Sequence, residues 1–140
     1  MKNTLKISFL LIVLFTINII AQSSIKQTEV KSALTNLFDL CKNKNYKDAS
    51  DYLAYNGKDA DRNGKSTFNY ANKSERKIVK RKCKKIKAYL DLSDSYEYDD
   101  FSTNGNKGNI NVIFKSGDQE LKIVFIFIKT GKKILLSDFK

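Results

Sequence analysis

The stretch INVIFKSGDQELKIVFIFI, residues 110–128, decides the fold. Ile110, Val112 and Phe114 occupy alternate positions, which predicts a strand with one buried face. Ser116-Gly117-Asp118 predicts a turn, and the strand that follows it is apolar at every position from 123 to 128. A strand that is apolar on both faces lies at the centre of a sheet and is covered on both sides. We expect the second cover to come from curvature of the chain or from a second copy, as a homodimer through the sheet face.

Two further strands flank this pair. Tyr96 and Tyr98 open one strand, which ends near Thr103, before Asn104-Gly105. Another runs from Ile134 to Phe139 after the turn residues Thr130-Gly131-Lys132. Because the connections are short, the strands are predicted to form an antiparallel meander of about four strands.

Helical patterns precede the strands. The first helix has Thr28 as its expected N-cap and apolar residues spaced i, i+3, i+4, i+7: Val30, Ala33, Leu34, Leu37, Phe38 and Cys41. A second is expected to start after Asn45 and to stop at Gly57. A third starts after Asn72, which forms a capping-box pattern with Glu75. Helices followed by strands predict an α+β fold, with N-terminal helices packed on one face of the sheet.

The first 21 residues resemble a secretory signal peptide. Lys2 and Lys6 precede a mostly apolar stretch from Ile7 to Ile20, and Ala21 precedes Gln22. The apolar stretch is shorter than the roughly 20 residues that a membrane-spanning helix needs. We therefore expect cleavage near Ala21 and a secreted or periplasmic single domain over residues 22–140, with a retained membrane anchor as the alternative. The mature chain would hold 24 basic and 15 acidic residues, a formal net charge of +9.

The residues that are absent restrict the chemistry. The sequence contains no histidine, which excludes catalytic triads that use imidazole and most zinc sites. It also lacks a glycine-rich phosphate loop, so no catalytic residue, metal or cofactor is predicted. The one cluster with groups suited to acid–base chemistry is Tyr96, Tyr98, Asp99 and Asp100. It lies near an expected sheet edge, where tyrosines commonly serve only packing.

The third helix carries the densest basic surface. Its cations lie opposite the apolar arc, at Arg76, Lys77, Lys80, Arg81, Lys84, Lys85 and Lys87. This surface is either a solvated outer face or an anion-docking surface, for which Lys77, Lys80, Arg81 and Lys84 are the candidates. Docking fails if the acidic residues fold back over the helix: Asp91, Asp94, Glu97, Asp99 and Asp100. Because only three of the 26 basic residues are arginine, specific nucleic-acid recognition is not expected.

Three residues on the apolar helix faces have alternative roles. Lys82 projects near the middle of the apolar arc, where it either snorkels along the edge of the core or lines an internal ligand cavity. Cys41 and Cys83 occupy apolar positions of two different helices. We expect a disulfide between them, because an exported protein meets oxidising conditions, and the alternative is two buried thiols.

The order of these segments resembles a known family. The segment Asn45-Tyr46-Lys47-Asp48-Ala49 leads into Tyr52-Leu53, and Phe68-Asn69-Tyr70 precedes the lysine-rich helix. The chain closes with Phe125-Ile126-Phe127-Ile128-Lys129 and Leu135-Leu136-Ser137-Asp138. This pattern is similar to small exported bacterial domains of unknown function in the nuclear transport factor 2-like (cystatin-like) superfamily. The resemblance implies a curved antiparallel sheet around helices, with a cone-shaped cavity that enzymatic relatives use for catalysis.

These observations favour an exported, non-enzymatic binding or accessory domain. Its ligand would be a small apolar molecule in the cavity or an anionic component of the envelope. The alternatives are an enzyme similar to the isomerases and dehydratases of the superfamily, or a purely structural envelope protein. The enzyme alternative is weakened because no carboxylate interrupts the apolar faces of the two central strands.

Overall fold

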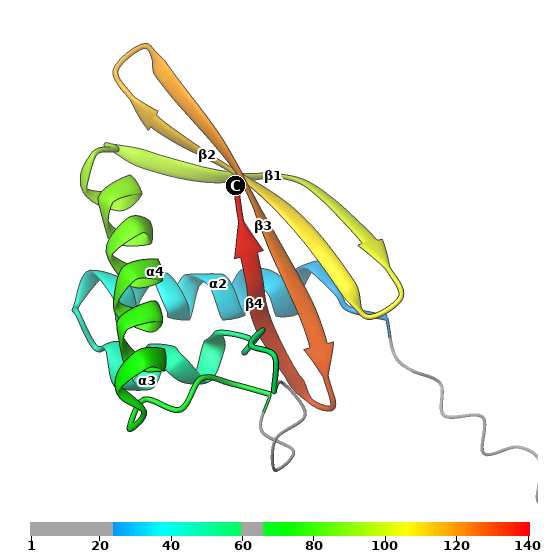
Figure 1. The fold of residues 1–140 in the computed structure, drawn as a ribbon. Helices are drawn as coiled ribbons and strands as arrows, with labels where there is room; N and C mark the ends of the chain where they lie inside the picture. The colour runs from blue at the N-terminus through cyan, green and yellow to red at the C-terminus, as the bar shows by residue number, and fades with distance from the viewer. Residues whose placement is uncertain (1–23, 60–65) are drawn as a thin grey trace, which may run out of the picture.

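The computed structural model describes residues 24–59 and 66–140, so the predicted signal peptide lies outside the described residues. The helical segments come first: α2 (Gln27–Lys42), α3 (Tyr46–Ala49), the 3₁₀ turn η1 (Ser50–Tyr52) and α4 (Lys73–Asp91). The strands follow: β1 (Ser95–Asn104), β2 (Lys107–Ser116), β3 (Gln119–Thr130) and β4 (Lys133–Phe139). They form one antiparallel sheet in the order β1-β2-β3-β4, and the helices pack beside it (Figure 1). The predicted α+β fold is confirmed.

The central position of β3 follows from its two apolar faces. On one face Ile123, Phe125 and Phe127 are buried in the core against the helices. On the other face the side chains of residues 124, 126 and 128 are half-buried. The single chain therefore covers the second face in part, and a homodimer through the sheet face stays a prediction.

Two irregularities bend the sheet around the helices. The β1–β2 register shifts between Tyr98 and Phe101, and the β3–β4 register shifts between Ile126 and Phe127. An extra residue in one strand of a pair bends that strand and increases its twist. The strong twist that results is visible in Figure 1.

The start of α2 differs from its prediction. The N-cap is Lys26, whose backbone N–H donates to Glu29 Oε2 at 2.9 Å. The prediction of Thr28 as the cap was wrong, because Glu29 reaches back from the third helical position and fixes the start of the helix two residues earlier. The other end of α2 closes through Lys44, whose φ of 58° allows the Asn45 N–H to donate to the Leu40 carbonyl at 2.9 Å.

The second helix ends earlier than the position of Gly57 predicts. Its helical turns stop at Tyr52, and Leu53 is extended. The Ala54 N–H donates to the Leu136 carbonyl of β4 at 2.8 Å, and Leu53 is bridged to the same residue. Pairing with a strand that lies far away in the sequence therefore overrides the local helical pattern.

The cap of α4 is confirmed. Asn72 Oδ1 accepts from the backbone N–H groups of Ser74 at 2.9 Å and Glu75 at 3.2 Å. The Glu75 carboxylate accepts instead from the Asn69 N–H, at 2.6 Å. This bond ties the loop that precedes α4 to its first turn.

Aromatic side chains fill the space between the helices and the sheet. The ring of Phe38 on α2 lies 5.3 Å from the ring of Tyr96 and 5.5 Å from that of Phe125, and Phe125 stacks on Phe139 at 5.4 Å. Phe38 is only 2% exposed. In this chain the interior of the cone is therefore a packed core at these positions.

The two cysteines meet where α2 packs on α4. Cys41 and Cys83 are both fully buried, and both are free thiols. A hydrogen bond with Cys83, together with burial, raises the pKa of the Cys41 thiol. The prediction that both residues lie on core faces is confirmed, but the predicted disulfide is not formed in this structure, because the two sulfur atoms are not at bonding distance.

Candidate functional site

The outward side of α4 forms the candidate site. Val79, Cys83 and Ile86 face the core, so the opposite side of the helix points to solvent. We define the α4 basic face as its exposed cations: Lys73, Lys77, Lys80, Arg81, Lys84 and Lys85. They span about 18 Å along the axis, at about 1.5 Å per residue. All four predicted anion-binding residues are therefore brought together on one exposed face.

The acidic residues that follow α4 do not cover this face. The Glu97 carboxylate pairs with Lys115 at 2.9 Å, and Lys122 pairs with Asp99 at 2.7 Å. The hydrogen bond from Lys122 holds the pKa of the Asp99 carboxyl below its usual value. Asp100 lies 3.8 Å from the same ammonium group. These carboxylates are therefore held by lysines of β2 and β3.

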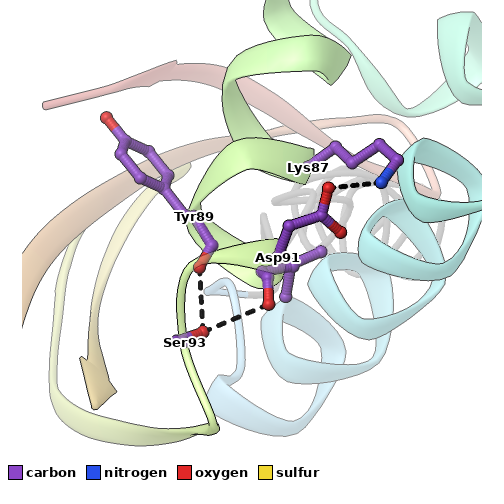
Figure 2. A network of polar contacts seen from close by, with 5 residues as sticks. Lys87, Tyr89, Asp91 and Ser93 are labelled. Carbon is purple, nitrogen blue, oxygen red and sulfur yellow. Dashed lines mark hydrogen bonds and ion pairs between the residues drawn. The ribbon is translucent and has the colours of Figure 1, made fainter. Parts of the chain in front are cut away.

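The remaining two acidic residues are held at the end of α4. Asp91 pairs with Lys87 one turn earlier, and the Ser93 hydroxyl donates to the Tyr89 carbonyl at 2.8 Å (Figure 2). Asp94 accepts from the Gly117 N–H at 3.0 Å. Within the described part of the chain, none of the four predicted anion-binding residues forms an ion pair.

Aromatic rings support the edges of the α4 basic face. The Lys80 ammonium lies 5.8 Å from the centre of the Tyr46 ring, and the Arg76 guanidinium lies 5.9 Å from that of Tyr70. A cation over a ring keeps its charge and remains available to a further anion. The contacts restrict two long side chains without neutralising them.

Lys82 contacts the last strand, β4. Its Nζ donates to the Ser137 carbonyl at 3.3 Å and lies 5.9 Å from the centre of the Phe139 ring. Burial lowers the pKa of this ammonium group. Lys82 is absent from the linings of the three grooves described below, and its contacts match the snorkelling alternative.

The tyrosine–carboxylate cluster does not assemble in this structure. Tyr98 points toward α2, where its hydroxyl lies 2.7 Å from Thr35 Oγ1. Burial raises the pKa of Tyr98 to about 12. Asp99 pairs with Lys122 of β3. The phenol and the carboxylate thus have separate partners and do not form an acid–base pair.

Three of the grooves on the surface are lined by described residues that bear on a binding role. One of about 490 Å³ lies between α2, η1 and β4, and another of about 450 Å³ lies between α3, η1 and the residues preceding α4. Both contain Asp48, Asp51 and Lys133. The third, of about 320 Å³, lies at the end of α4 beside Leu92 and Leu121, which are 76% and 47% exposed. The first two grooves could not be predicted from the sequence, because they depend on how η1 meets the edge of β4.

Comparisons with known proteins define the fold. A de novo designed NTF2 fold protein, NT-9, aligns with a TM-score of 0.54 and 15% identity, over 83% of this chain and 87% of that one. The chain has the nuclear transport factor 2-like fold. A candidate NTF2-like transpeptidase from Campylobacter jejuni aligns with a TM-score of 0.49 and 12% identity, over 77% of this chain and 96% of that one. No family model matches the sequence, and no curated protein matches it.

The nuclear transport factor 2-like fold accommodates both binding proteins and enzymes. It therefore does not supply a function by itself. In the described residues, no helix has the length and apolar character needed to span a membrane.

Proposed function

We propose that this chain is an exported, non-enzymatic binding domain that attaches to an anionic surface of the cell envelope through the α4 basic face. One observation carries the proposal: six exposed cations lie on one helix, while the neighbouring acidic residues Asp91, Asp94, Glu97 and Asp99 have partners other than these six. Unpaired exposed lysines attract an anionic surface because their field is not cancelled locally. Each lysine close to an anionic lipid surface contributes about 1 kcal/mol.

The predominance of lysine fits a surface better than a specific anion. Five of the six cations of the α4 basic face are lysines. Lysine acts as a hydrated point charge, whereas specific recognition of phosphate or bases favours the planar fork of arginine. We therefore assign the face to attraction toward a diffuse anionic surface.

A binding role is favoured over catalysis because of the interior. Aromatic rings occupy the space in front of Phe125, and the Tyr98 hydroxyl is bonded to Thr35. A catalytic site in the cone needs room for a substrate beside an acid–base group. Binding through the exposed face of α4 requires no internal cavity.

The experiment is cosedimentation with vesicles of phosphatidylglycerol and phosphatidylcholine. The variant Lys77→Glu/Lys84→Glu should bind at least about 30-fold more weakly, since it loses about 2 kcal/mol. The matched control Lys107→Glu/Lys132→Glu changes two exposed lysines near hairpin turns on the side away from α4 (Figure 1). Both variants have the same net charge, and both should keep their stability within about 0.5 kcal/mol per substitution.

Two results would contradict the proposal. One is equal binding by the α4 variant and the hairpin variant, which would show that only net charge matters. The other is binding that persists at an ionic strength of about 1 M, where the Debye length is about 3 Å.

A further inference from the structure

The groove between α2, η1 and β4 contains an open edge of the sheet. One edge of β4 pairs with β3. On its other edge, the Leu136 carbonyl accepts from the Ala54 N–H at 2.8 Å. Before Leu53 the chain turns away as η1. The edge of β4 is therefore covered beside Leu136 and open before it.

The backbone of Ile134 continues this open edge. In an antiparallel strand, residues two apart direct their N–H and C=O groups to the same side. The register is regular from Thr130↔Lys133 to Phe127↔Leu136, so Ile134 has the same orientation as Leu136. Neither backbone group of Ile134 has a hydrogen-bond partner on this side in the described residues. Ile134 also lines the groove.

Carboxylates surround this edge in an otherwise basic chain. Asp48 and Asp51 line the groove from α3 and η1, and both are exposed. Asp51 forms no ion pair or side-chain hydrogen bond with a described residue. Glu29 lies at the other end and is paired with Lys129 at 3.2 Å. Among the described lining residues Lys133 supplies the one ammonium group, against the carboxylates of Asp48 and Asp51, so the local charge favours a cation.

We propose that this groove binds a short extended peptide that carries a basic side chain. One peptide residue pairs with the N–H and C=O of Ile134, as in strand addition to a sheet edge. A neighbouring lysine or arginine of the peptide reaches Asp51, and an apolar side chain rests on Ala33 and Leu135. The volume of about 490 Å³ is in the range of sites for small ligands. This site is separate from the α4 basic face.

The first test is a nuclear magnetic resonance titration with the capped tripeptide acetyl-Lys-Val-Lys-amide. We expect saturable shifts centred on the Ile134 amide. The acidic counterpart acetyl-Glu-Val-Glu-amide should give none. A peptide with N-methylvaline should bind at least about fivefold more weakly, because it loses a backbone hydrogen bond.

The second test uses the protein variant Asp51→Asn, with Asp118→Asn in the β2–β3 turn as the matched control. Asp51 is chosen because Asp48 accepts a hydrogen bond from Asn45 at the start of α3. Asp51→Asn should weaken the lysine peptide about threefold, the size expected for an exposed ion pair, while the control stays unchanged. Absence of saturable shifts, equal binding of the N-methylated peptide, or equal effects of the two variants would overturn the proposal.

Discussion

Replacing Phe38 tests whether the interior of the cone is packed. Phe38 is 2% exposed, and its ring meets the rings of Tyr96, Phe114 and Phe125 at 5.3, 6.1 and 5.5 Å. Truncation of a buried phenylalanine to alanine removes its transfer energy and leaves a cavity. Phe38→Ala should therefore lower the free energy of unfolding by about 3–5 kcal/mol. Phe38→Leu keeps most of the volume and should cost about 1–2 kcal/mol.

The assay is urea unfolding followed by circular dichroism, with unchanged m-values as the check on two-state behaviour. Leu92→Ala is the control, since Leu92 is 76% exposed and its truncation should cost within about 0.5 kcal/mol. A loss below about 1.5 kcal/mol for Phe38→Ala would contradict a tightly packed interior. It would mean that Phe38 lies in a loose interior with room for a ligand.

Three further predictions concern Lys44, Tyr98 and the two cysteines. Lys44 has a φ of 58°, in the left-handed region that favours glycine. In urea melts, Lys44→Gly should therefore raise the free energy of unfolding by about 0.5 kcal/mol, and Lys44→Val should lower it by about 1 kcal/mol or more. A higher free energy of unfolding for Lys44→Val would show that residue 44 does not hold this conformation. Burial raises the pKa of Tyr98 to about 12, so the stability that it contributes should be complete below pH about 10 and lost as the pH rises from about 10 to about 12. Alkaline unfolding compared between the wild type and Tyr98→Phe measures this loss, and identical pH profiles would count against it. Cys41 and Cys83 are fully buried free thiols, so a thiol reagent should react with them only as fast as the reduced protein opens; immediate reaction of the native protein would disprove their burial.

Periodicity was sufficient to predict the elements whose patterns are long. The two apolar faces of β3 predicted its central place, and the basic and apolar sides of α4 predicted which residues are exposed. The ends of α2 and η1 were predicted less well. Lys26 caps through the carboxylate of Glu29, and Leu53 leaves the helix because of β4. Such helix ends depend on which hydrogen-bond partners compete for the backbone, and local helix propensity does not describe these partners.

The sequence predicted the exposed residues of the candidate site but not the partners of the residues around it. Exposure of Lys77, Lys80, Arg81 and Lys84 follows from helical spacing. The partners of the acidic residues do not, because they depend on the register of β1 on β2 and of β2 on β3. The open edge at Ile134 depends on a bridge between residues 53 and 136. A local sequence pattern cannot predict a contact between residues so far apart in the sequence.

Contact between the α4 basic face and an anionic surface can be observed directly. The most direct measurement is the relaxation of backbone amide signals by a gadolinium-labelled lipid in phosphatidylglycerol vesicles, resolved residue by residue. We expect the strongest broadening over residues 77–85, and its loss at high salt. Broadening centred on the hairpin turns near Lys107 and Lys132, or spread evenly over the chain, would contradict it.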